Sequence, residues 1–137
     1  MPEYHMPFGS DAAVTQFVTL DSFTQGYITA MFFTETVHEN DLKGAEFAEL
    51  HPDSLVKIVA ECAEFQHSFA EQIDVAKEVP GYDDERAGND FWLTRNRHGA
   101  GFWDRGLSHA GDYLTKMSHA YGELHLCRGD DGMIHVE

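Results

Sequence analysis

The chain has few positive charges: 9 Lys+Arg against 24 Asp+Glu give its 137 residues a formal net charge of -15. DNA, RNA and anionic lipid repel such a protein, so we expect no direct binding to nucleic acid or to a membrane surface. Basic surfaces attract it, and nucleic-acid-binding proteins are the largest class that carries them. The charge favours a protein partner with a basic surface, although many soluble proteins are acidic without having such a partner.

Long apolar runs, cysteines and targeting signals are also scarce. No stretch approaches the roughly 18 consecutive apolar residues of a membrane span. The first ten residues lack the basic and apolar regions of a secretory signal. Cys62 and Cys127 are therefore expected to be free thiols in a cytosol. Because 42% of the residues are hydrophobic, the chain can form a core. We expect one globular domain over 13–137 and a flexible N-terminal tail over 1–12.

Apolar residues recur mostly at helical spacing. The predicted helices run from Asp21 to about Glu35, from His51 to just before Pro80, from Asp83 or Asp84 to near Gly99, and from Ser108 to Gly122. The aromatic residues in 91–94 leave a strand as an alternative there. Residues 36–52 are polar, and we expect at most a short helical turn around Phe47 and Leu50.

The C-terminal residues change to a period of two. Only the register that pairs residue 126 with 136, and 127 with 135, puts the apolar side chains of both strands on one face. This register leaves a three-residue loop at 130–132, in which Gly132 is free to take a positive φ. We therefore predict an α+β fold, mainly α, with three to four helices packed on a small antiparallel β-hairpin at the C-terminus. Because a lone hairpin is marginally stable, another strand or a second copy in a homodimer could complete it.

Residues 91–106, here called the Arg/Trp segment, are cationic and aromatic within this acidic chain. One interpretation is a pocket for a small anion, such as a nucleotide or phosphorylated metabolite, because guanidinium groups suit phosphate and tryptophan rings can stack. The candidate ligand-binding residues are Trp92, Arg95, Asn96, His98, Trp103, Asp104 and Arg105. The other interpretation is structural, with the arginines paired to internal carboxylates and the Phe-Trp pairs anchoring the core.

The long helix predicted after His51 has a carboxylate stripe opposite its apolar stripe. At about 100° per residue, Glu64, Glu71, Asp74 and Glu78 share one face and span about 21 Å. We call these four residues the acidic face. It is either a binding surface for a partner or an ordinary solvated helix face.

Metal and enzyme chemistry have less support. In the predicted hairpin register His125, Cys127 and His135 share one face and could begin a zinc site, but their spacing matches no zinc-finger or zinc-ribbon pattern. Polar strand residues are the simpler interpretation. We find no nucleophile elbow and no phosphate-binding or dinucleotide motif, so the pattern does not favour an enzyme and we expect no cofactor.

Residues 89–106, Asn-Asp-Phe-Trp-Leu-Thr-Arg-Asn-Arg-His-Gly-Ala-Gly-Phe-Trp-Asp-Arg-Gly, resemble the core signature of a family of small acidic proteins encoded by tailed bacteriophages. The resemblance covers roughly residues 85–137, and it departs from the family at Arg97, where the family has a small residue or glycine. The family has no established activity. The resemblance therefore implies a setting, a phage-encoded protein in the host cytoplasm, and no mechanism. Together with the net charge and the acidic face, it favours an accessory protein that binds a host or phage protein. The open edge of the predicted hairpin leaves a virion component or a self-associating protein as another alternative.

Overall fold

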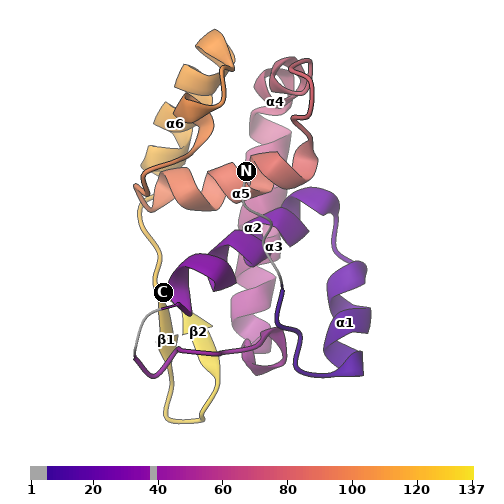
Figure 1. Cartoon of the computed structure of the whole chain (residues 1–137), viewed down its shortest axis with the longest axis vertical. Coiled ribbons are helices and arrows are strands. Elements are labelled where there is room, and N and C mark those ends of the chain that lie inside the picture. Colours follow the sequence, from indigo (N-terminus) through magenta and orange to yellow (C-terminus); the bar gives the residue numbers. More distant parts are fainter. Residues whose placement is uncertain (1–5, 38–39) are drawn as a thin grey trace.

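The computed structural model describes residues 6–37 and 40–137, and it confirms an α+β fold that is mainly α (Figure 1). Its helices are α1 (Asp11–Val18), α2 (Ser22–Glu35), α3 (Pro52–Ser68), α4 (Ala70–Ala76), α5 (Asp84–Arg95) and α6 (Ser108–Ala120). Two 3-10 turns, η1 (Phe47–Glu49) and η2 (Phe102–Asp104), precede α3 and α6, and strands β1 (Leu126–Arg128) and β2 (Ile134–Val136) close the chain. The described residues thus hold six helices where three to four were predicted.

Helices α2 and α5 lie against each other at the centre of the molecule (Figure 1). Their backbones touch at two glycines: a Cβ on Gly26 would overlap the Glu85 carbonyl, and one on Gly88 would overlap the Phe23 carbonyl. Only glycine allows so close an approach. The Asn89 side chain then donates a hydrogen bond of 2.6 Å to the Gly26 carbonyl. This contact fixes the centre of the fold and the direction of α5.

Three helices begin where the sequence predicted. Asp21, His51 and Asp83 are the N-caps of α2, α3 and α5, and each side chain accepts a hydrogen bond from a backbone N–H two or three residues ahead. Helix α5 runs through residues 91–94, so the strand alternative there is wrong. Gly122, at a φ of 78°, follows the end of α6 as expected.

The long helix predicted from His51 to Pro80 is broken in two at Phe69. Phe69 has φ -122° and ψ 29°, so α3 ends at Ser68 and α4 starts at Ala70. The Phe69 ring packs edge-on against Phe65 and Tyr113, with centroid distances of 4.9 and 5.8 Å. Apolar spacing continues across the break, which is why the sequence pattern did not show it.

The hairpin has the predicted register, with Leu126 opposite Val136 and Cys127 opposite His135. Gly132 takes a positive φ of 78° in the loop. The hairpin joins the helices through the segment before α3, where an isolated parallel bridge pairs Leu50 with residue 134. Leu50 of the same chain therefore contacts β2, but among the described residues the sheet has two strands and this bridge adds no third one.

The N-terminal residues that the structure describes are packed on the domain. The carbonyls of Pro7 and Phe8 accept hydrogen bonds of 2.8 and 3.0 Å from residues 47 and 48. The Phe8 ring lies edge-on to Phe17 at 5.2 Å. The packed part of the chain thus begins before the expected boundary at residue 13, while residues 1–5 of the expected tail lie outside the described residues. No helix within the described ranges has the length and apolar character needed to cross a membrane.

Candidate functional site

Arg95, at the end of α5, is buried and fully engaged by its own fold. Its side chain is 1% exposed. Nε and Nη2 donate to the carbonyls of Gly122 and Tyr121 at 2.9 and 3.1 Å, and Nη1 donates to Tyr27 Oη and Glu61 Oε1 at 3.1 Å each. Arg95 thus satisfies carbonyls at the C-terminal end of α6 and neutralises one carboxylate. It has no exposed donor to offer a ligand.

Arg105 holds a second internal carboxylate. Its Nε and Nη2 donate to both oxygens of Asp90 at 3.0–3.2 Å, and the Tyr82 hydroxyl donates to Asp90 Oδ2 at 2.8 Å. The Asp90 side chain is completely buried. Burial raises the pKa of Asp90, and the hydrogen bonds from Arg105 offset part of that rise. This bidentate pair attaches the loop after α5 to the buried face of α5.

The two tryptophans lie in different environments, so they do not form one stacking floor. Trp92 is fully buried, and its Nε1 donates to Thr34 Oγ1 at 2.8 Å. Trp103 in η2 is 51% exposed. Asn96 is occupied as well, because its amide bonds the Trp92 carbonyl and the Leu124 N–H at 3.0 and 2.8 Å. Of the predicted pocket residues, Trp92 and Asn96 therefore serve the scaffold.

The chain turns sharply at Arg97 after α5. Arg97 has a φ of 56°, and its N–H bonds the Thr94 carbonyl, while the His98 N–H bonds the Leu93 carbonyl at 2.9 Å. These two bonds close a Schellman motif, whose left-handed position usually holds glycine. His98 is partly buried in this turn, and Asp104 is exposed in η2. The geometry thus supports the structural interpretation of the Arg/Trp segment over an anion pocket.

The break at Phe69 divides the acidic face between two helices. Glu64 lies on α3, Glu71 and Asp74 lie on α4, and Glu78 follows α4, so the four do not lie on the one continuous helix that was predicted. All four are exposed. Glu64 accepts a hydrogen bond of 2.6 Å from the Tyr121 hydroxyl.

The hairpin does not assemble the metal site that its register suggested. His135 Nε2 lies 3.0 Å from Asp131 Oδ2, and the Cys127 thiol donates to Glu137 Oε1 at 2.8 Å. That hydrogen bond raises the pKa of Cys127 to about 11. His125 is exposed. In the part of the chain that the structure describes, no three His, Cys, Asp or Glu side chains are placed to hold a metal ion.

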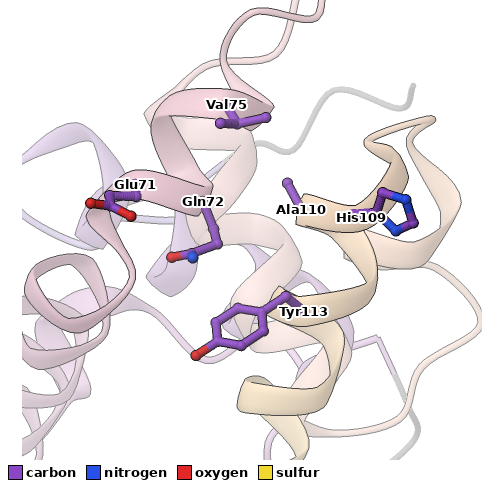
Figure 2. Close-up of a pocket in the computed structure, with 6 residues that line it drawn as sticks. All are labelled: Glu71, Gln72, Val75, His109, Ala110 and Tyr113. Atoms are coloured by element: carbon purple, nitrogen blue, oxygen red, sulfur yellow. The ribbon is translucent and has the colours of Figure 1, made fainter.

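Two hollows lie beside α6, and the sequence pattern did not indicate either. Figure 2 shows the first, of about 420 Å³ between α4 and α6, lined by Glu71, Gln72, Val75, His109, Ala110 and Tyr113. The second, of about 530 Å³ between α3 and α6, is lined by Glu61, Glu64, Ser68, Phe69, Met117, Ala120 and Tyr121. Each hollow contains one member of the acidic face. Each hollow combines residues from α6 or its end with residues from α3 or α4, which lie far away along the chain, so helix periodicity alone could not reveal it.

The arrangement separates charge by depth: two arginines point inward to carboxylates, and most acidic residues lie at the surface. Neither thiol is activated as a nucleophile, since burial raises the pKa of Cys62 and Glu137 raises that of Cys127.

Comparisons with protein-family models, with curated proteins and with solved structures find no match to this chain.

Proposed function

We propose that this chain is a small acidic accessory protein, encoded by a tailed bacteriophage, that binds a protein with a basic surface in the host cytoplasm. The observation that carries the proposal is the placement of charge. Arg95 and Arg105 are paired with carboxylates of the fold itself. The side chains of the acidic face are exposed to solvent, in a chain of net charge -15. The phage setting rests on the resemblance of residues 89–106.

The partner class follows from electrostatics. Single surface ion pairs contribute only about 0–1 kcal/mol, so affinity would come from many carboxylates acting together. Such a surface accelerates association with a basic protein and disfavours nucleic acid or acidic proteins. A nucleic-acid-binding protein of host or phage has the complementary charge. Binding should therefore weaken steeply as salt screens the carboxylates.

A salt-resolved capture experiment tests the proposal. Immobilised protein is exposed to host lysate, with and without phage infection, at about 50 mM and about 500 mM salt, which changes the screening length roughly threefold. We expect basic proteins to be enriched at low salt and lost at high salt. If no basic protein is enriched at either salt concentration, the proposal is refuted.

A pair of charge-matched variants locates the surface. One neutralises the acidic face with Glu64→Gln, Glu71→Gln, Asp74→Asn and Glu78→Gln. The other removes the same charge from exposed positions elsewhere, with Asp11→Asn, Asp41→Asn, Glu123→Gln and Asp130→Asn. The first variant should lose the partner at a lower salt concentration than the second, because only it changes the proposed contact surface. Equal losses would show that net charge alone matters.

A further inference from the structure

One face of α6 borders both hollows. The α6 residues at the first hollow are His109, Ala110 and Tyr113, and those at the second are Met117, Ala120 and Tyr121, which follows the helix. At about 100° per residue, all six positions fall within about 120° of the helix circumference. The hollows therefore lie along one side of α6, and we call the two together the α6 trough.

The first hollow is lined mainly by apolar surface, and carboxylates lie among the lining residues of both hollows. Val75 is 51% exposed and Tyr113 is 41% exposed, so both present apolar surface to solvent. In Figure 2, the side chains of Gln72 of α4 and Tyr113 of α6 both extend into the space between the two helices. The charged groups on α4 and α6 are three carboxylates and one lysine: Glu71, Asp74, Asp112 and Lys116. Glu64 adds a carboxylate at the second hollow.

We infer that the α6 trough binds a basic amphipathic helix of the partner, with one apolar side chain seated in each hollow. This inference rests on the proposed function and specifies its contact surface. Residues 109–121 span about 18 Å, which is the length of about three helical turns. The midpoints of the lining residues 109–113 and 117–121 are eight residues apart, or about 12 Å at helical rise, close to the roughly 10.5 Å between residues i and i+7 of a helix. Lysine or arginine beside these anchors would lie near Glu64 and Glu71.

The apolar side chains and the cationic side chains of the bound helix contribute to binding in different ways. Burial of an apolar side chain in each hollow supplies affinity that salt does not screen. The carboxylates that line the hollows select a basic helix over an acidic one, because a like charge beside Glu64 or Glu71 would be repelled. Repulsion by the carboxylates therefore disfavours an acidic helix, and a purely polar helix lacks the apolar side chains that would be buried in the hollows.

The test uses defined peptides with the full-length protein. The probe is a fluorescent amphipathic peptide of about 15 residues, built of alanine and lysine with two leucines about seven residues apart. A second peptide replaces both leucines with serine, and a third replaces the lysines with glutamate. The protein variants are Val75→Ser in the first hollow and Ala120→Arg in the second, with Val56→Ser on α3, 68% exposed and outside both hollows, as the matched control.

Fluorescence anisotropy at low salt should show the leucine peptide binding more tightly than the serine peptide, and the glutamate peptide not binding. Val75→Ser should weaken the leucine peptide by at least about fivefold, and Ala120→Arg by about tenfold, whereas Val56→Ser should leave its affinity unchanged. Circular dichroism confirms that each variant is folded.

Three results would overturn the inference. Equal binding of the leucine and serine peptides would leave a purely electrostatic surface, so the trough would fail while the proposed basic partner stands. Unchanged binding by Val75→Ser and Ala120→Arg would place the contact elsewhere, with the same consequence. A dimer in sedimentation velocity that Ala120→Arg dissociates would assign the trough to a second copy of this chain. Failure of both lysine peptides to bind at low salt would count against the proposed function itself.

Discussion

Replacing Arg95 by lysine should destabilise the protein strongly although it preserves the charge. Arg95 donates in four directions from a planar group: to the carbonyls of Tyr121 and Gly122, to Tyr27 and to Glu61. A lysine ammonium is a single donor centre on a flexible stem and cannot reproduce that fork. The substitution therefore tests whether Arg95 acts through its hydrogen-bond geometry or only through its charge.

The expected loss follows from the contacts that lysine cannot remake. At least two of the four acceptors would lose their donor, and each unsatisfied buried group costs about 1–3 kcal/mol. Two unsatisfied groups at this cost give about 2–6 kcal/mol, and we expect Arg95→Lys to lose about 3–5 kcal/mol of stability. For a domain of this size the melting temperature should drop by roughly 10–15 °C.

Urea unfolding monitored by circular dichroism measures the effect. Arg97→Lys is the control, because Arg97 is exposed in the same segment and the change should cost less than about 0.5 kcal/mol. Glu61→Gln keeps an acceptor beside Arg95 and should cost about 1 kcal/mol. If Arg95→Lys stays within about 1 kcal/mol of the wild type, the reasoning that makes Arg95 a structural residue is wrong.

Three further predictions concern stability. Gly88→Ala should destabilise by more than about 3 kcal/mol in urea unfolding, because the new Cβ meets the Phe23 backbone, whereas Gly99→Ala, with open space around it, should cost under about 1 kcal/mol. Arg97→Gly should stabilise by about 0.5–1 kcal/mol by removing a side chain from a left-handed position, and Arg97→Ala should not. Burial alone would raise the pKa of Asp21, but hydrogen bonds from Thr24 and Gln66 hold it below its ordinary value. Ionised Asp21 therefore stabilises the fold above about pH 4 and loses that effect as acid protonates it, so the advantage of wild type over Asp21→Asn should shrink between about pH 5 and pH 2. An advantage that stays constant over this range would contradict that account.

Features set by local chemistry were predictable from the sequence. Asp21, His51 and Asp83 cap helices because their side chains reach backbone N–H groups only a few residues away. The hairpin register followed from alternation of apolar residues, since a slip of one residue would turn the apolar side chains of one strand to solvent. The sequence also located the cationic Arg/Trp segment, because composition alone shows it.

Only the tertiary structure decided what that segment does in the fold. The carboxylates that engage Arg95 and Arg105, Glu61 and Asp90, lie 34 and 15 residues away along the chain. Sequence spacing does not encode which distant side chains meet. The break at Phe69 was hidden for a related reason, since apolar periodicity is the same on both sides of it and its ring packs against Tyr113 of a distant helix. That break divides the acidic face between α3 and α4. The sequence by itself thus determined where α2, α3 and α5 begin, the hairpin register and the net charge. Long-range packing decided the break between α3 and α4 and which charges are buried.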